Sequence, residues 1–181
     1  DRTFQKMEPD LLGPVIDVHL KGAFYVTRPA WVKMREQGYG RVVSTSSTSG
    51  IFGNFGQTNY GAAKAGIYGM VRVMAIEGRK YNIRVMGLAP GAYTRMTSDL
   101  PGRKGQEPDP LSLPENIAPG VLFMVSDLAA DHSGKILGVS SRGVREIKML
   151  ETEGFAPGRP YTAEEVAANA DKVGGQSGLR K

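Results

Sequence analysis

Arg41-Val42-Val43-Ser44-Thr45-Ser46 is a short run of β-branched and small residues, typical of a strand buried in a sheet. Two similar runs follow it, Ile83-Arg84-Val85-Met86-Gly87-Leu88-Ala89 and Lys135-Ile136-Leu137-Gly138-Val139. Helical patterns separate the three runs, and strands that alternate with helices pair in parallel through right-handed crossovers. The sequence therefore predicts the α/β fold class, with an open, doubly wound parallel sheet covered by helices on both faces.

Long helices are predicted on both sides of the first strand. From Pro9 to Arg35 apolar residues recur near helical spacing, and Gly13-Pro14 is expected to delay or kink the start of this helix. Gly38-Tyr39-Gly40 ends it. A second helix is predicted from about Asn59 to about Tyr81, after a glycine-punctuated loop over residues 44–56.

Two capping boxes mark further helix starts. Ser112-Leu113-Pro114-Glu115 has the spacing of one box, and its helix is expected to reach Leu128, with a kink or a second start at Pro119. Thr162-Ala163-Glu164-Glu165 has the spacing of the other and predicts a short helix to about Val173.

Composition excludes several kinds of function. The 181 residues contain no cysteine, which excludes disulfides and thiol catalysis, and two histidines without thiols predict no metal site. No apolar run approaches the ~20 residues of a membrane-spanning helix, so no membrane partner is expected. The absence of cysteine fits a reducing compartment, and the last residues are not a Ser-Lys-Leu address, so we expect a cytoplasmic location.

Basic residues are concentrated in one part of the chain. Between Arg72 and Lys104, seven basic residues face only Glu77 and Asp99, so this stretch carries the whole net charge of +5. The seven are Arg72, Arg79, Lys80, Arg84, Arg95, Arg103 and Lys104. They form either a solvated helix face and loop or a patch that guides a phosphorylated substrate or cofactor. Nucleic acid is not an expected partner, because no aromatic residues alternate with these charges.

The first candidate catalytic motif is Tyr60-x-x-x-Lys64, near the start of the second helix. Residues four apart share one helix face, so the phenol and the ammonium are neighbours. A phenol has an ordinary pKa of ~10, and a nearby cation favours its anion, which would let Tyr60 exchange a proton with a substrate. The alternative is a packed tyrosine beside a solvated lysine.

Two features at neighbouring strand ends favour the chemical interpretation. Ser47 follows the first strand, and its hydroxyl would hydrogen-bond a substrate oxygen or, alternatively, cap local backbone. Pro90-Gly91 ends the second strand and is followed by Thr94, which places a rigid turn and a hydroxyl at the same edge of the sheet. Ligands of open α/β sheets bind at this edge.

These motifs, in this order and spacing, resemble the short-chain dehydrogenase/reductase family. The resemblance rests on Ser46-Ser47-x-x-Gly50, Tyr60-x-x-x-Lys64, Arg84-Val85 leading into Pro90-Gly91, and Gly134-Lys135-Ile136. It implies that residues 1–145 are the C-terminal part of a single NAD(P)-binding, Rossmann-like domain, and that residues 146–181 are an extension with a short helix. The implied activity is hydride transfer between NAD or NADP and a carbonyl or alcohol.

The resemblance also implies a role for each residue. Ser47 would polarise the substrate and Tyr60 would be the general acid/base. Lys64 would lower the tyrosine pKa and hold the nicotinamide ribose. Pro90, Gly91 and Thr94 would contact the nicotinamide end of the cofactor. By the same resemblance, the helices over 9–35 and 59–81 would pack against their copies in a homodimer or homotetramer.

A narrower likeness indicates the substrate. Three strings resemble the (3R)-hydroxyacyl-CoA dehydrogenase part of the peroxisomal multifunctional β-oxidation enzyme and its bacterial single-domain relatives. They are Val18-His19-Leu20-Lys21-Gly22, Gly53-Asn54-Phe55-Gly56-Gln57-Thr58-Asn59-Tyr60 and Ala75-Ile76-Glu77-Gly78-Arg79-Lys80. The implied substrate is a 3-hydroxyacyl thioester that is oxidised to a 3-oxoacyl thioester, and the basic stretch would suit the phosphates of CoA.

The sequence departs from the family pattern at two points. His19 stands where most of the family has an asparagine that holds a water in a proton relay, so His19 is either a fourth catalytic residue or a structural histidine. The Gly-rich dinucleotide fingerprint would precede Asp1 and does not occur in these residues. The alternatives are therefore another short-chain reductase, acting on a 3-oxoacyl-carrier-protein, sugar or steroid, or a truncated non-catalytic fragment or assembly module.

Overall fold

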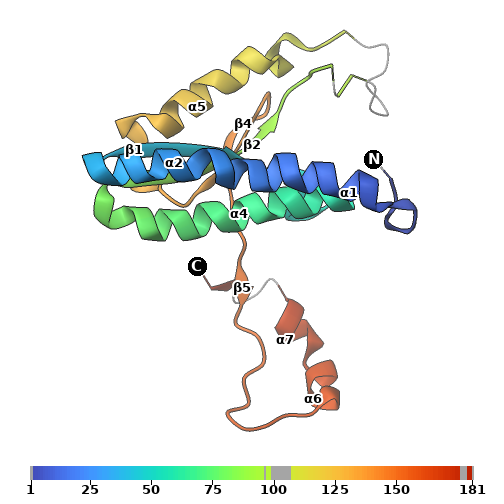
Figure 1. The fold of residues 1–181 in the computed structure, drawn as a ribbon. Helices are drawn as coiled ribbons and strands as arrows, with labels where there is room; N and C mark the ends of the chain where they lie inside the picture. Colours follow the sequence, from blue (N-terminus) through green and yellow to red (C-terminus); the bar gives the residue numbers. More distant parts are fainter. Residues whose placement is uncertain (1, 96, 99–106, 176–178, 181) are drawn as a thin grey trace. The chain divides into compact units, whose positions relative to one another are not determined.

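The fold was analysed in a computed structural model, which describes all residues except 1, 96, 99–106, 176–178 and 181 (Figure 1). The chain divides into two compact units, residues 1–147 and residues 148–181. Each unit is described by itself. Among the described residues, no helix has both the length and the apolar composition that crossing a membrane requires.

The first unit is built on a four-stranded sheet in the order β1-β2-β3-β4. β1 (Gly40–Thr45), β2 (Ile83–Gly91) and β3 (Ile136–Ser140) pair in parallel, which confirms the predicted α/β class. β4 (Gly143–Ile147), a strand that was not predicted, is antiparallel to β3. The two strands join through a tight turn, too short for the crossover that parallel strands need.

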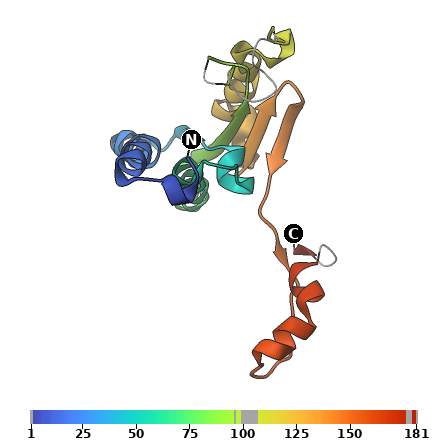
Figure 2. The same cartoon turned by 90° about the vertical axis from the view of Figure 1, so that its right-hand side faces the viewer.

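Apolar residues on the two faces of the sheet form two cores. On β2, Ile83 and Val85 face one core together with Ile67 of α4 (Thr58–Gly78). Met86 and Leu88 of β2 face the other core, together with residues of α5 (Ala118–Val125). α2 (Gly22–Gln37) lies beside α4, and α5 covers the opposite face, as Figure 2 shows. Helices on both faces are therefore confirmed.

The long N-terminal helix has an irregular middle that sequence reasoning placed wrongly. α1 (Pro9–Ile16) begins at Pro9, so Gly13-Pro14 does not delay its start. A π-helical segment, η2 (Asp17–Lys21), joins α1 to α2. A short 3₁₀ turn, η1 (Phe4–Lys6), precedes them. Gly38 ends α2 in a left-handed conformation with φ of +65°, as predicted.

Two further predictions need correction. The loop after β1 contains a short helix, α3 (Thr48–Phe52), and α4 is followed by the 3₁₀ turn η3 (Arg79–Tyr81). The capping box at Ser112 does not form, because Ser112 ends one 3₁₀ turn and Leu113, which has no side-chain oxygen, is the N-cap of the next. Pro119 sits in the first turn of α5, which confirms the predicted second start at this proline.

The 3₁₀ turns around α5 complete the first unit. They are η4 (Pro110–Ser112), η5 (Pro114–Ile117) and η6 (Asp127–His132). The predicted helix to Leu128 therefore ends at Val125 as an α-helix and resumes as a 3₁₀ helix.

The second unit confirms the other capping box. The Thr162 hydroxyl accepts from the Glu165 N–H at 3.3 Å, and the Glu165 carboxylate accepts from the Thr162 N–H at 3.1 Å. The box opens α6 (Ala163–Ala168), and α7 (Ala170–Gly174) follows. β5 (Glu151–Thr152) and β6 (Leu179–Arg180) form an antiparallel pair.

A close approach of α3 to α4 fixes the loop after β1. A Cβ atom added at Gly50 would lie 2.6 Å from the Ala65 backbone nitrogen, so α3 packs backbone to backbone on α4 only because residue 50 is glycine. Backbone atoms cannot turn aside as a flexible side chain can, so any larger residue at position 50 would push the two helices apart.

We predict opposite effects for two Gly→Ala substitutions in helices. Gly50→Ala should lower the free energy of unfolding by about 1–3 kcal/mol, because of overpacking. Gly69→Ala, in the middle of α4 with no atom within 4 Å of its added Cβ, should raise it by about 0.5–1 kcal/mol. Chemical denaturation of the full chain measures both values. Equal effects of the two substitutions would contradict the close approach.

Candidate active site

The carboxyl ends of β1 and β2 meet at one edge of the sheet. Thr45 pairs with Leu88, and the Ser46 N–H donates to the Leu88 carbonyl at 2.7 Å, which extends the pairing by one residue. The chain then enters α3 on one side and, after Pro90-Gly91, the loop that follows β2. This is the edge at which open α/β sheets bind ligands.

Lys64 is buried at this edge, with only 7% of its surface exposed. Its ammonium donates to the Thr45 carbonyl at 2.8 Å, and its backbone carbonyl accepts from the Ser46 hydroxyl at 2.8 Å. These two bonds join the first turns of α4 to the end of β1. Burial lowers the pKa of Lys64, because a charged ammonium loses hydration there.

Tyr60 and His19 lie next to this lysine. The Lys64 ammonium is 5.6 Å from the centre of the Tyr60 ring. The His19 ring meets the Tyr60 ring edge to face, with 5.3 Å between centroids. Leu20 packs where a Cβ at Gly66 of α4 would stand, 2.7 Å away, so the π-helical segment lies tightly against α4. The structure thus brings together three of the predicted catalytic residues, as the i, i+4 spacing indicated for two of them.

Asn59 is a site residue that sequence reasoning missed. Its amide nitrogen donates to the Leu11 carbonyl at 2.7 Å, and its amide oxygen accepts from the Tyr60 N–H at 2.8 Å. One side chain therefore connects α1 to the first turn of α4 directly beside Tyr60. Asparagine at a helix start is a recognised capping signal, and it could have identified this residue.

Ser47 begins α3 as its N-cap. Its side-chain oxygen accepts from the Ser49 N–H at 3.1 Å, which is the capping role anticipated as an alternative. A hydroxyl that accepts one hydrogen bond can still donate its proton, so the cap leaves the hydroxyl available to a substrate oxygen. In the described part of the chain, Ser47 and Tyr60 are not hydrogen-bonded to each other.

The predicted cofactor contacts lie at the end of the neighbouring strand. Pro90 and Gly91 are the last residues of β2 and pair with Val139 and Ser140 of β3. The Thr94 N–H donates to the Thr97 hydroxyl at 2.8 Å, and the two hydroxyls are 3.4 Å apart. Thr94 therefore makes these bonds within its own loop rather than with Tyr60 or Lys64.

The basic stretch from Arg72 to Lys104 does not form one patch. Arg84 begins β2 on the side away from the candidate site, whereas Arg95 follows the end of β2. The six residue-to-residue steps from Arg84 to Pro90 span roughly 20 Å of extended strand. Arg103 and Lys104 lie outside the described residues.

Comparisons with known proteins place the chain in a family. A family model described as short chain dehydrogenase matches residues 1–104. The short-chain type dehydrogenase/reductase Rv0148 of Mycobacterium tuberculosis is 41% identical over 182 residues, covering 99% of this chain and 62% of that protein. An acetoacetyl-CoA reductase of an Acinetobacter species is 41% identical over 147 residues, which are 77% of this chain and 59% of that enzyme.

A solved structure is similar over the whole chain. The full-length peroxisomal multifunctional enzyme type 2 of Drosophila melanogaster superposes with a TM-score of 0.85 at 33% identity, covering 100% of this chain and 33% of that one. The chain spans less than two thirds of the length of each of these relatives. With the family model matched over more than half of its residues, this chain belongs to the short-chain dehydrogenase family.

Proposed function

We propose that the protein is an oxidoreductase that transfers a hydride between a nicotinamide cofactor and a 3-hydroxyacyl or 3-oxoacyl thioester. The observation that carries the proposal is the buried Lys64 ammonium beside the Tyr60 phenol at the carboxyl end of β1. A similar enzyme is named for acetoacetyl-CoA, which is a 3-oxoacyl thioester, and this supports the choice of substrate. On this proposal residues 1–145 belong to the cofactor-binding domain and residues 146–181 extend it.

The donors at the site fit the nicotinamide end of such a cofactor. Lys64 has three N–H donors, and one of them is occupied by the Thr45 carbonyl. The others are available to ribose hydroxyls, while Pro90, Gly91 and Thr94 would hold the nicotinamide from the end of β2. NAD or NADP, when bound, would supply the hydride acceptor or donor.

Tyr60 would carry the proton that accompanies hydride transfer. In the oxidising direction the deprotonated oxygen of Tyr60 takes the proton of the 3-hydroxyl group, and in the reducing direction the phenol O–H gives its proton to the 3-oxo oxygen. Lys64 is a cation one helical turn away, and its charge would stabilise negative charge on the Tyr60 oxygen during the proton transfer. The Ser47 hydroxyl would donate to the reacting oxygen and stabilise its developing charge.

His19 would connect this proton transfer to solvent. Burial lowers the pKa of His19, and the positive charge of Lys64 lowers it further. The imidazole is therefore neutral at pH 7, with one nitrogen that donates and one that accepts. Its edge-to-face contact with Tyr60 places this group beside the phenol.

Substitutions at the site should separate chemistry from folding. We predict that Tyr60→Phe lowers kcat/KM for acetoacetyl-CoA reduction by at least about 100-fold, because the proton donor is lost. Ser47→Ala should lower it by about 100-fold through loss of the donor to the oxygen. Tyr25→Phe is the matched control, since Tyr25 is 72% exposed on α2, and it should leave the rate unchanged.

The assay uses the full chain, acetoacetyl-CoA and NADH or NADPH, and follows the loss of absorbance of the reduced cofactor. Full turnover by the Tyr60→Phe variant would end the proposal that Tyr60 carries the proton, whereas no turnover by the parent would favour the assembly-module alternative. Circular dichroism of each variant establishes that a lost rate is not a lost fold.

The lowered pKa of His19 predicts a pH effect on stability. Below the ordinary histidine pKa of about 6.5, the unfolded chain binds a proton at residue 19 more readily than the folded chain does. Stability should therefore be lost as the pH falls through this range and regained above it. We predict that the melting temperature drops less between pH 7.5 and pH 5.5 in a His19→Gln variant than in the parent. Identical drops would show that His19 is not held in this environment.

A further inference from the structure

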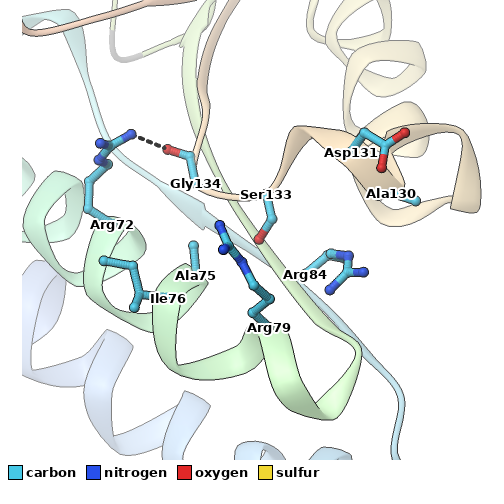
Figure 3. A pocket seen from close by; sticks show the side chains of 9 residues that line it. All are labelled: Arg72, Ala75, Ile76, Arg79, Arg84, Ala130, Asp131, Ser133 and Gly134. Carbon is cyan, nitrogen blue, oxygen red and sulfur yellow. Dashed lines mark hydrogen bonds between the residues drawn. The ribbon is translucent and has the colours of Figure 1, made fainter.

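A second polar cavity lies at the opposite end of β2 from the candidate active site. It has a volume of about 420 Å³ and is formed by the last turns of α4, the start of β2 and the turn before β3 (Figure 3). The polar residues that line it are Arg72, Arg79, Arg84, Asp131 and Ser133. Roughly 20 Å of extended strand separates Arg84 from Pro90, so the two sites do not overlap.

The charges around this cavity are not balanced. Three guanidinium groups face it, against the single carboxylate of Asp131. Arg72 donates to the Gly134 carbonyl at 3.3 Å. Within the described residues, the guanidinium groups of Arg79 and Arg84 have no ion-pair or hydrogen-bond partner, and the Asp131 carboxylate is paired with neither. The cavity therefore has a surplus of positive charge and of unused N–H donors.

Arg84 contributes an unpaired hydrogen-bond donor at this cavity. Its Nε atom is buried and has no hydrogen-bond partner. Buried donors in folded proteins are nearly always paired, because leaving one unpaired costs its hydration. Figure 3 shows Arg79, Arg84 and Ser133 among the side chains that line the cavity.

That wall is rigid and its own polar atoms are already paired. The Ser133 hydroxyl accepts from the Val85 N–H at 3.1 Å, and the Gly134 N–H donates to the Val85 carbonyl at 2.7 Å. Gly134 has φ of +86°, a conformation that side chains other than glycine rarely adopt. The donors left for a ligand are therefore those of the arginines.

We propose that Arg72, Arg79 and Arg84 form a second binding site for the phosphate group of a small phosphorylated molecule. Three guanidinium groups and one carboxylate give a net charge of about +2, which a phosphate dianion neutralises and a carboxylate does not. The planar guanidinium fork matches the spacing of phosphate oxygens. The cavity exceeds the size of phosphate alone and lies within the range of small-molecule sites, so the rest of the ligand also fits.

Calorimetric titration of the full chain with inorganic pyrophosphate, at constant ionic strength, tests this site. We expect saturable binding that weakens about tenfold or more in the Arg79→Gln/Arg84→Gln double variant, because charge-assisted hydrogen bonds are lost. The Arg28→Gln/Lys33→Gln double variant removes the same two charges from exposed positions on α2 and should leave the affinity unchanged.

Asp131→Asn tests the site through an expected gain of affinity. Misfolding of a variant cannot produce such a gain, so this test does not depend on the fold of the double variant. It removes the only carboxylate of the cavity from an exposed turn and should tighten pyrophosphate binding. No saturable binding by the parent would overturn the proposal, as would equal affinity of the parent and the double variant. Binding that is unchanged by Asp131→Asn would also overturn it. Because these variants lie outside the candidate active site, the rate of acetoacetyl-CoA reduction tests the proposed function separately.

Discussion

The candidate active site depends on one buried cation. The Lys64 side chain is almost enclosed, and its ammonium bonds to the Thr45 carbonyl at the end of β1. Its backbone carbonyl accepts the Ser46 hydroxyl, so the same residue is tied twice to the strand end. Burying a charge is costly, and folded proteins retain such groups mainly where they serve a site. Tyr60 and His19 are arranged around this cation.

The arrangement divides the sheet into two chemically different ends. At the carboxyl end, the Lys64 ammonium and the His19 imidazole lie beside the Tyr60 phenol. At the other end of β2, the arginine-lined cavity has a surplus of positive charge and offers no comparable proton carrier. The basic residues that appear as one stretch along the chain are thus distributed by the strand to two separate places.

Patterns within single segments of the sequence predicted three strands, one helix face and one helix start correctly. The β-branched and aliphatic runs located β1, β2 and β3, and an i, i+4 spacing placed Tyr60 and Lys64 on one helix face. The capping box at Thr162 also formed, because its partners lie within one helical turn and no proline interrupts them.

Features that depend on tertiary packing were not predictable in the same way. β4 has four exposed residues among five, so it lacks an apolar run and becomes a strand only by pairing with β3. The contact of His19 with Tyr60 requires the π-helical segment to lie against α4, which neither helix pattern reveals. The Ser112 box did not form because the N-cap position is taken by Leu113, which has no side-chain oxygen to accept a hydrogen bond.

Titration of the Lys64 ammonium tests the central claim most directly. Selective ¹⁵N labelling of lysine, with a Lys64→Met variant to assign the signal, would report its pKa by nuclear magnetic resonance in the full chain. Burial between β1 and α4 predicts a pKa below the ordinary lysine value of about 10.4. A pKa at or above that value would place the amine in water and contradict this account of the site.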